Sequence, residues 1–434
     1  METTLLEKIS SVDNLYKVWG TLRKRKSSHG LTDEETIETF QKNLDSRIKS
    51  ISLQLREHSY KFSSYRPVLI PKDNGGYRPL QIPEISDRLV LKALAIEIEG
   101  HFKDILDENR DVSFAYQTNL GIKDAVYKIL SHKNVGNNYI LEADLINFYG
   151  NVNKNALIDL VLQKLPDNSL NNLIISALNQ TVGELDKRID KDKHDYFYGI
   201  NDGIPQGNSL SPLLSNIYLA PFDKCMKEKG YSLVRYADDF VILCSTEEKC
   251  NEAYLECQDI LGENKLNLPM HKLNIADKGK IKTQILNIES TPLSFLSITF
   301  DKNSFYPSRK NVEELKEKLF KEVFKAGKTD VHFIITKVKN KLDGWISAFY
   351  YTDVDRYSKE IDVFIDRQLY RSLRDLGWRL TTSSLGRVPK KFRIQGESPY
   401  CLSKDQRKSS GIPFCNKLIE AKRKIAPEDI IAEL

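Results

Sequence analysis

Two spacings of apolar residues divide the chain into helical and strand-forming parts. Residues 1–60 carry apolar positions at helical spacing, and residues 312–376 do so again, with a gap at 327–330. Between these stretches, short apolar runs bounded by turn residues alternate with helix candidates, and the candidate at 89–98 is rich in good helix formers. This division suits a helical part beside a part that mixes strands and helices.

The run 232–244 places two adjacent acids between strand-like stretches. Asp238 and Asp239 interrupt apolar residues on both sides, which predicts a tight β-hairpin with the acids at its tip. Neighbouring carboxylates repel each other and lose solvation, and a divalent cation, which we expect to be magnesium, neutralises them. By itself the pair is a weak signal, because most Asp-Asp pairs are solvated turns or helix caps.

A third acid ends another predicted strand. The apolar run 139–149 delivers Asp144 at the carboxyl end of a strand, although the same residue could cap a helix. Between the acidic segments, residues 203–216 form a glycine-bounded turn that leads into a helix candidate. This turn lets backbone approach a planar ligand, and Gln206 offers an amide that both donates and accepts. It could equally be an ordinary strand-to-helix connection.

Residues 68–83 predict a β-hairpin that presents Lys72 and Arg78. Such a hairpin is usually a solvated surface ribbon. Here it precedes two segments with candidate metal ligands, and recognition of a triphosphate needs cations opposite the metal. The mixed-charge run 184–195, by contrast, indicates a surface loop without a functional role.

The order of these four elements resembles that of reverse transcriptases, specifically the bacterial enzymes related to group II introns. The resemblance extends over roughly residues 10–375. Further matching segments correspond to the N-terminal extension, the fingers, a lysine-bearing turn, the primer grip and the thumb: 15–37, 84–90, 266–272, 293–297 and 341–350. Two positions depart from the family pattern. Ser297 replaces a usual glycine, and residues 115–117 read Ala-Tyr-Gln where Gly-Phe-Arg is common.

The resemblance implies a right-hand polymerase with an α+β fold. Its fingers and palm combine an antiparallel sheet with helices, its thumb is helical, and a short basic region follows. The implied parts are a helical N-terminal extension (1–60), fingers and palm (61–305), thumb (306–376) and basic C-terminal region (377–434).

The implied activity is that of an RNA-directed DNA polymerase, with an RNA template, deoxynucleoside triphosphates as substrates and DNA as product. The implied cofactor is a pair of magnesium ions, for which manganese can substitute. Asp144 and Asp238 would bridge the ions, and Asp239 would bind metal more weakly or steady the hairpin. The carbonyl of Leu145 would add an oxygen ligand.

The family's nucleotide- and primer-binding positions fall on Lys72, Arg78, Gln206, Lys272, Phe295 and Leu296. The first two would bind the triphosphate, Gln206 would line the nucleotide pocket, and Lys272 would be a proton donor to pyrophosphate. Tyr149, five residues after Asp144, would lie beneath the sugar and clash with a 2′-hydroxyl. The alternative is a tyrosine of the protein core.

Composition is ordinary for a soluble globular protein, with 40% hydrophobic and 29% charged residues. No apolar run approaches the ~20 residues of a membrane span, and the first residues show no signal-peptide pattern. We therefore expect a cytoplasmic protein without membrane contact. Six cysteines form no Cys-x-x-Cys pair, and seven scattered histidines form no HNH-type nuclease cluster. The oligomeric state stays open.

The net charge of +5 is unevenly distributed. Residues 377–434 hold 12 Lys/Arg against 6 Asp/Glu, which favours a surface that binds the nucleic-acid backbone. A solvated terminus is the alternative. The basic residues that we expect in this surface are Arg387, Lys390, Lys391, Arg393, Lys404, Arg407 and Lys408.

The biological role is inferred from domain content and resemblance. About 58 residues follow the thumb, too few for a DNA-binding region plus an endonuclease, so we expect a stand-alone enzyme that copies a structured noncoding RNA in bacterial defence against phage. One alternative is an intron-encoded maturase and reverse transcriptase without endonuclease. Another is an inactive RNA-binding protein on a polymerase fold.

Overall fold

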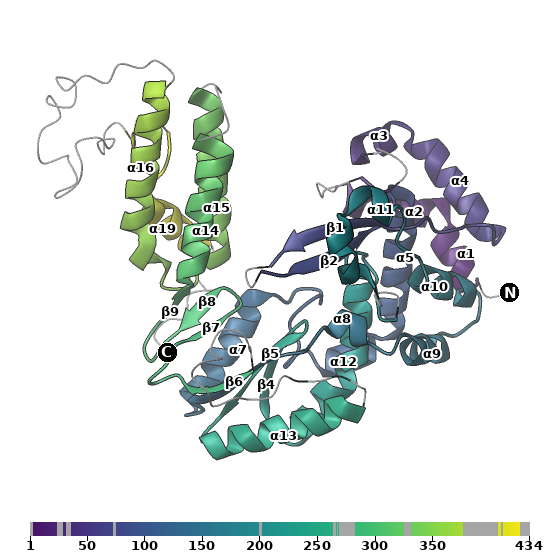
Figure 1. Ribbon diagram of the computed structural model, residues 1–434, viewed down its shortest axis with the longest axis horizontal. Helices are drawn as coiled ribbons and strands as arrows, with labels where there is room; N and C mark the ends of the chain where they lie inside the picture. Colours follow the sequence, from purple (N-terminus) through teal and green to yellow (C-terminus); the bar gives the residue numbers. More distant parts are fainter. Residues whose placement is uncertain are drawn as a thin grey trace, which may run out of the picture. The chain divides into compact units, whose positions relative to one another are not determined.

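The computed structural model describes residues 3–23, 29–31, 36–72, 75–198, 202–263, 266, 268, 283–324, 331–375, 407–408 and 411–425. The chain forms two compact units, Met1–Leu286 and Asn287–Leu434 (Figure 1). Both combine helices with antiparallel sheets, so the predicted α+β class is confirmed. The four domain boundaries inferred from the sequence remain a prediction. None of the described helices is both long and apolar enough to cross a membrane.

Four short helices open the first unit: α1 (Leu5–Ser10), α2 (Val12–Leu22), α3 (Ile37–Lys42) and α4 (Leu44–Arg56). The first two begin where a hydroxyl caps a free backbone donor. Thr4 accepts from the N–H of Glu7, and Ser11 accepts from the N–H of Asn14. Their apolar faces pack on one another and on α5 (Ile85–His101). The helical start predicted from the spacing is confirmed.

A two-stranded ribbon follows the N-terminal helices. Strands β1 (Arg66–Pro71) and β2 (Tyr77–Ile82) pair antiparallel, from Arg66 opposite Ile82 to Pro71 opposite Tyr77. This is the hairpin predicted from the sequence. Helix α5 leads from the ribbon to α6 (Lys103–Glu108) and α7 (Ile122–Asn134).

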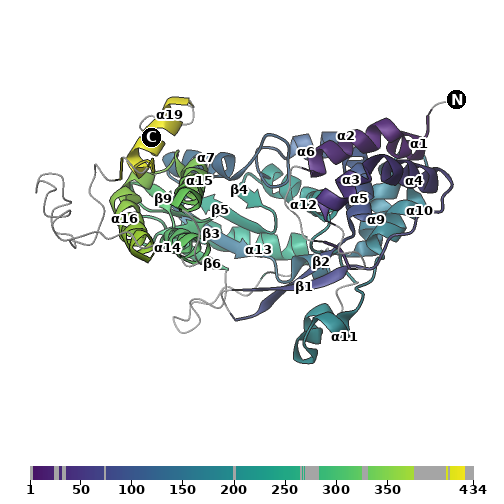
Figure 2. The same ribbon diagram turned by 90° about the horizontal axis from the view of Figure 1, so that it is seen from above.

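A four-stranded sheet forms the centre of the first unit. Its strands lie in the order β4 (Ser232–Tyr236), β5 (Asp239–Cys244), β3 (Tyr139–Asp144) and β6 (Gln284–Asn287), as Figure 2 shows. Helix α13 (Glu247–Glu263) packs against β3 and β5, whereas α7 and α12 (Ser211–Glu228) pack against β4. Residues 240–244 of β5 are all buried, because helices cover the sheet.

Short helices connect β3 to α12. They are α8 (Phe148–Asn151), α9 (Lys154–Lys164), α10 (Asn171–Leu178), α11 (Leu185–Arg188) and a 3-10 helix, η1 (Lys191–Phe197). The last two correct the prediction that 184–195 is a surface loop. Within the run, Leu185 and Ile189 are partly buried and His194 is buried. Helix α11 contacts β1, and η1 contacts β2.

The second unit contains a small sheet and long helices. Strands β7 (Leu293–Phe295), β8 (Ile298–Phe300) and β9 (Phe305–Pro307) form an antiparallel sheet in that order. The helices are α14 (Arg309–Leu319), the π-helical segment η3 (Phe320–Phe324), α15 (Val331–Phe349), the 3-10 helix η4 (Val354–Tyr357), α16 (Ser358–Asp375) and α19 (Cys415–Ile425). The prediction of helix throughout 312–376 is wrong at residues 350–357, where a turn and η4 separate α15 from α16.

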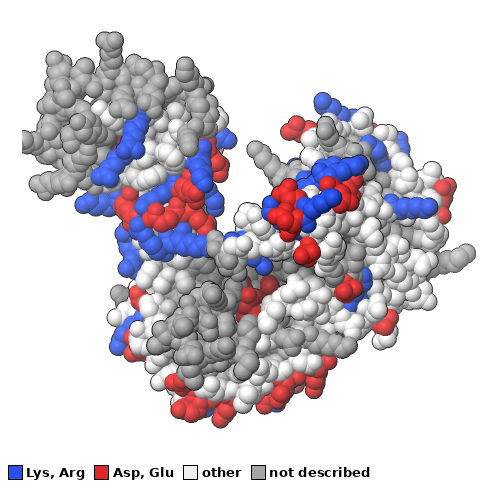
Figure 3. All heavy atoms as spheres, viewed as in Figure 1, with Lys and Arg blue, Asp and Glu red and all other residues white. Residues whose placement is uncertain are grey.

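One arginine of the basic C-terminal region is fully buried. Arg407 pairs with Asp362 and Asp366 of α16 at 2.8 Å each. Its remaining N–H groups donate to the carbonyls of Asp362, Ile412 and Pro413. The expectation that Arg407 belongs to a nucleic-acid-binding surface is therefore wrong, because its charge is neutralised inside the unit. Exposed charges of this unit are also mixed, and Figure 3 shows Lys and Arg beside Asp and Glu over its helices.

A buried carboxyl on α5 makes the first unit sensitive to pH. Asp87 is 1% exposed and accepts hydrogen bonds from the Tyr60 hydroxyl at 2.7 Å and the Ser63 N–H at 3.0 Å. Burial outweighs these bonds and raises the pKa of Asp87 to about 6. The folded protein therefore binds this proton more tightly than the unfolded chain does, in which the pKa is about 3.9.

The free energy of unfolding should fall as pH rises through the window between these two pKa values, by up to about 1.4 kcal/mol per pH unit from this group. Protonation stabilises the folded state fully below the window, and that stabilisation is gone above the folded pKa of Asp87. Urea unfolding of wild type and Asp87→Asn across this range measures it, since the variant lacks the titration. Parallel pH profiles for the two proteins would contradict the assignment.

Candidate active site

The sheet brings acids from distant parts of the chain together. Strands β3 and β5 are neighbours, and their register places Asp144 directly opposite Asp239. Directly opposed residues have Cα atoms about 4.5–5.5 Å apart. Asp238 immediately precedes β5 in the turn, and all three carboxylate residues are partly buried. The strand end predicted for Asp144 and the hairpin predicted for Asp238 and Asp239 are both present.

The hairpin turn is strained. Tyr236 pairs with Asp239, so the loop consists of Ala237 and Asp238. Ala237 has φ 62°, in the left-handed region that costs a residue with a Cβ about 1 kcal/mol or more. Such a conformation persists only where surrounding contacts hold it. Ala237 is itself buried, at 8% exposure.

The donor set of the turn suits magnesium bound together with a substrate. Within the described ranges, no three His, Cys, Asp or Glu side chains form a group that could hold a metal ion unaided. Magnesium usually takes one or two protein carboxylates and completes its shell with water and substrate phosphates. The carboxylates of Asp144, Asp238 and Asp239 supply the hard oxygens that this requires. A ligand role for the Leu145 carbonyl stays a prediction.

Tyr149 lies in α8, five residues after Asp144. It is partly buried, and its ring meets that of Phe148 edge to face at 5.4 Å between centroids. Burial raises the pKa of the Tyr149 hydroxyl, and the nearby Tyr116 and Asp238 raise it further. Tyr116, which the sequence marked only as a departure from the family pattern, is 52% exposed and has φ 60°.

The loop that carries Gln206 is clamped between α8 and the ribbon. Ile204 donates its N–H to the Tyr149 carbonyl at 2.9 Å. A Cβ on Gly203 would lie 1.9 Å from the same carbonyl oxygen, so only glycine fits there. On the other side, the Gln81 N–H donates to the Gln206 carbonyl at 2.7 Å, and the Gln206 N–H donates to the Gln81 side chain at 3.2 Å.

The side chain of Gln206 has an unused acceptor. Its Oε1 is buried and has no hydrogen-bond partner in the described part of the protein. An unsatisfied buried acceptor costs about 1–3 kcal/mol, so a donor from a ligand would offset that cost. The next residue, Gly207, has φ 121° and approaches Gln81 so closely that a Cβ would lie 2.7 Å from its carbonyl. Glycine is needed here for both reasons.

The predicted triphosphate ligands lie on the ribbon. Lys72 and Arg78 are both exposed, and Arg78 pairs with Ile70 across the strands. Strand alternation places the Arg78 side chain on the opposite face from Gln81, which contacts the Gln206 loop. The structure thus joins the ribbon to this loop through Gln81. It shows no contact of Lys72 or Arg78 with the acids among the described residues, and their role stays a prediction.

The predicted primer grip belongs to the second unit. Leu296 and Ser297 form the two-residue turn between β7 and β8, with φ 51° and 66°. Positive φ at both positions is the type I′ requirement, which favours glycine, so Ser297 is strained where the family usually has glycine. Phe295 is buried and Leu296 is partly buried. Their contacts with nucleic acid stay a prediction.

The remaining predicted site residues lie outside the described residues. They are Lys272, Arg387, Lys390, Lys391, Arg393 and Lys404.

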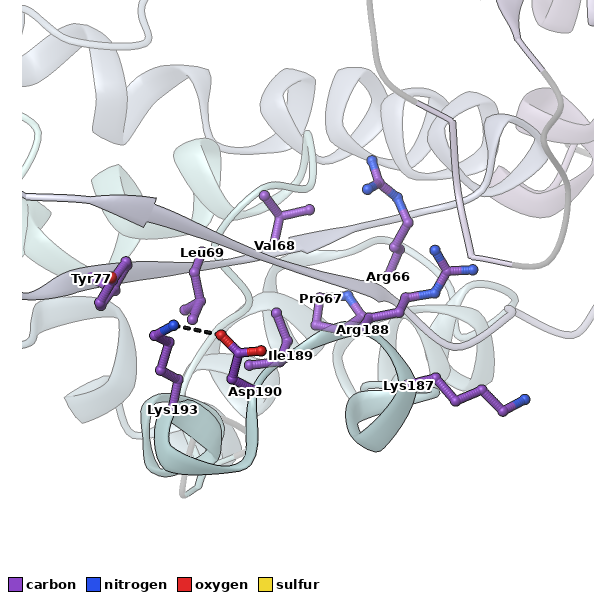
Figure 4. A pocket seen from close by; sticks show the side chains of 10 residues that line it. All are labelled: Arg66, Pro67, Val68, Leu69, Tyr77, Lys187, Arg188, Ile189, Asp190 and Lys193. Carbon is purple, nitrogen blue, oxygen red and sulfur yellow. Dashed lines mark hydrogen bonds and ion pairs between the residues drawn. The ribbon is translucent and has the colours of Figure 1, made fainter.

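A pocket that the sequence did not indicate lies between the ribbon and the 184–197 helices. It has a volume of about 530 Å³ and is shown in Figure 4. Its lining residues are Arg66, Pro67, Val68, Leu69, Tyr77, Lys187, Arg188, Ile189, Asp190 and Lys193. Four are cations and one is an acid, so the lining has a net positive charge. The alternating charges of 184–195 do not indicate that residues of this run line a pocket beside β1.

Two arginines of the pocket are fixed by backbone carbonyls. Arg66 Nε donates to the His29 carbonyl and Arg188 Nη2 to the Leu31 carbonyl, each at 2.9 Å. Arg188 also pairs with Glu184 at 3.2 Å. Burial lowers the pKa of Arg66, the nearby Arg188 lowers it further, and Glu84 raises it. An anion in the pocket would add an opposite charge beside these cations.

Comparison with known proteins matches this chain to a family model. Residues 70–300 match the family model described as reverse transcriptase (RNA-dependent DNA polymerase). The chain is 26% identical to protein YkfC of Escherichia coli over 270 residues, which cover 52% of this chain and 68% of that protein. It is 29% identical to the group II intron-encoded protein LtrA of Lactococcus lactis over 212 residues, 49% of this chain but 32% of LtrA.

A solved structure of apo telomerase from Candida tropicalis is also similar, with 13% identity and a TM-score of 0.41. The similar region covers 81% of this chain and 66% of that one.

Proposed function

Because this chain belongs to the reverse transcriptase family, we propose that it is an RNA-directed DNA polymerase whose active centre is the acidic end of β3, β4 and β5. The observation that supports this most is the register that sets Asp144 opposite Asp239, with Asp238 in the adjoining turn. An inactive RNA-binding protein would have no need for Asp144 opposite Asp239 with Asp238 in the adjoining strained turn. The pairing therefore argues against that alternative.

The reaction is the in-line attack of a primer 3′-hydroxyl on the α-phosphate of a deoxynucleoside triphosphate. Two bound magnesium ions, or manganese in their place, would favour loss of the hydroxyl proton and neutralise charge on the leaving pyrophosphate. Asp144 and Asp238 would hold the ions, with Asp239 steadying the hairpin and the Leu145 carbonyl adding an oxygen. Lys72 and Arg78 would bind phosphate oxygens, with Lys272 as proton donor.

The remaining residues would orient the nucleotide. Gln206 would use its unpaired amide oxygen to accept a hydrogen bond from the nucleotide. The ring of Tyr149 would exclude a 2′-hydroxyl, since the Gln206 loop fixes its backbone through Ile204. Deoxynucleotides are therefore the proposed substrates.

The direct test is extension of a DNA primer annealed to an RNA template, with magnesium and deoxynucleotides. The purified wild-type protein should make a full-length complementary strand. Absence of product with every template and primer combination, in magnesium or manganese, would reject the polymerase assignment.

The cationic pocket fits the phosphate backbone of the RNA template. Arg66 and Arg188 are already ordered by their carbonyl partners, so binding costs little additional side-chain entropy. Tyr77 and Tyr196, with ring centroids 5.4 Å apart, offer an aromatic surface beside the cations. Aromatic rings next to a basic groove are typical of sites that bind single strands.

The double variant Arg66→Gln, Arg188→Gln should weaken RNA binding and lower the salt dependence of the binding constant. Two lost phosphate contacts would reduce the logarithmic salt slope by about 1.4 for a single strand. Fluorescence anisotropy at several salt concentrations measures this. Lys164→Gln, which removes an exposed ion pair with Asp104 at 2.8 Å outside the pocket, is the matched control. An unchanged slope in the double variant would exclude the pocket from the template path.

The identity of the template distinguishes the two biological roles predicted from the sequence. In antiphage defence it would be a structured noncoding RNA encoded beside this chain, whereas an intron-encoded maturase would bind its own intron RNA. Sequencing of nucleic acid that copurifies with the protein, with and without phage infection, separates them. Intron sequence in the bound RNA would reject the defence role.

A further inference from the structure

A buried ion pair lies directly beneath the hairpin turn. Arg235 of β4 and Asp223 of α12 are each 1% exposed. Arg235 Nε donates to Asp223 Oδ1 at 2.6 Å, and Nη2 donates to Oδ2 of the same carboxylate. This bidentate geometry is the strongest arrangement available to the two side chains.

The other guanidinium donors reach the turn, a second residue of α12 and Ser113. Nη1 donates to the Ala237 carbonyl at 2.8 Å and to Asn216 Oδ1 at 3.1 Å, and Nη2 donates to Ser113 Oγ at 2.7 Å. All five N–H groups of Arg235 are thus used. No other side chain has this number of donors in a planar fork, so lysine could not replace it.

The backbone of Arg235 extends the same network. Its N–H donates to the Val112 carbonyl at 2.7 Å, and its carbonyl accepts from the Phe114 N–H at 3.0 Å. Asn216 Nδ2 donates to the Ala115 carbonyl at 2.8 Å. The segment 112–115, which leads to Tyr116, is therefore fixed to the same arginine and helix as the turn.

Stability alone does not account for an ion pair at this place. Burying two charges costs several kcal/mol per ion, and well-packed apolar residues of similar volume often stabilise a protein as much or more. What an apolar pair could not do is hold the Ala237 carbonyl. That carbonyl belongs to the strained residue, at φ 62°, immediately before Asp238.

We propose that the Arg235–Asp223 pair is a positioning device that holds the Ala237 carbonyl and thereby keeps the strained turn in the conformation that directs Asp238 at the metal. This inference rests on the proposed polymerase function. Arg235 touches no substrate in this scheme. It acts through the turn, and Asp223 and Asn216 fix its own orientation.

The decisive variant replaces both charges with apolar residues of similar size, Arg235→Met with Asp223→Leu. A double replacement leaves no unpaired charge in the core, so the protein should fold. We expect wild-type RNA affinity, a KM for deoxynucleotides within about threefold of wild type, and a kcat lower by about 10²-fold, the scale of a displacement of about 1 Å. A folded double variant with wild-type kcat would overturn the proposal.

Metal affinity provides a readout that does not depend on turnover. Electron paramagnetic resonance measures the concentration of free manganese and thereby the dissociation constant of the protein–manganese complex. We expect this dissociation constant to be about tenfold higher for the double variant, which corresponds to about 1.4 kcal/mol. If the wild type makes no DNA, the proposed function fails and manganese binding alone decides the positioning role. Equal manganese affinity in wild type and double variant would then overturn it.

Two further variants complete the design. Lys224→Met on the same helix removes an exposed ion pair with Glu108 at 2.9 Å and should leave both readouts unchanged. If the double variant does not fold, Asp223→Asn takes its place, because it keeps an acceptor for Arg235 but removes the charge. It should lower kcat by about tenfold, on the scale of a weakened charge-assisted hydrogen bond, and a folded Asp223→Asn protein with wild-type kcat would reject the proposal.

Discussion

Replacing Asp238 and Asp239 together with alanine should abolish DNA synthesis while the protein stays folded and still binds RNA. The variant removes one carboxylate in the turn and one at the start of β5, both partly exposed, so little packing is lost. Metal-assisted stabilisation of the transition state contributes several kcal/mol. Because each 1.4 kcal/mol corresponds to a tenfold change in rate, kcat should fall by about 10³-fold or more. Primer extension on RNA under single-turnover conditions measures the loss.

Asp144→Asn should have an effect of the same size, although its strand is distant in sequence. We expect an equally large loss of activity because the register of β3 and β5 sets Asp144 opposite Asp239. Glu142→Gln is the matched control on the same strand, where Glu142 accepts a hydrogen bond from Gln284 at 2.6 Å. A double hairpin variant that still extends a primer, or an Asp144→Asn protein as active as the control, would remove the acids from the active site.

Tyr149→Ala should increase ribonucleotide incorporation. If the ring collides with a 2′-hydroxyl, its removal relieves an overlap of about 1–3 kcal/mol, a factor of about 5–150 in discrimination. The ratio of kcat/KM for a deoxynucleotide and the matching ribonucleotide measures this factor. Tyr149→Phe keeps the ring, so it should keep the wild-type ratio.

The alternative assignment of Tyr149 to the core gives a different result. Its ring packs against Phe148, so truncation should also lower stability, by about 2–5 kcal/mol for a large buried side chain. Unfolding experiments separate the two effects. A loss of stability with an unchanged discrimination ratio would make Tyr149 a core residue without a selective role.

Local features of the site could be predicted from the sequence. Short apolar runs lie on both sides of Asp238 and Asp239 and before Asp144. Runs of this length predict strands, and each predicted strand is present. The glycines of the Gln206 loop likewise mark a close approach of backbone, which Gly203 and Gly207 both make. These signals depend only on neighbours in the chain.

Features that depend on distant partners could not be predicted. The pairing of Asp144 with Asp239 joins segments separated by a long stretch of helices. Arg235 and Arg407 looked like ordinary basic residues, and their burial depends on acids of other helices. The 184–195 run was misassigned for the same reason, since only the presence of β1 and β2 shows what its helices cover. Sequence alone identifies such charges but not their counterions.

The Gln206 loop is anchored to its surroundings largely by main-chain groups. The Ile204 amide meets the Tyr149 carbonyl, and the Gln206 amide and carbonyl meet Gln81. Anchors of this kind do not depend on which side chain the loop carries. During evolution the side chains of the loop can therefore change, and with them the preferred substrate, while the loop backbone and the acids of β3 and β5 keep their positions.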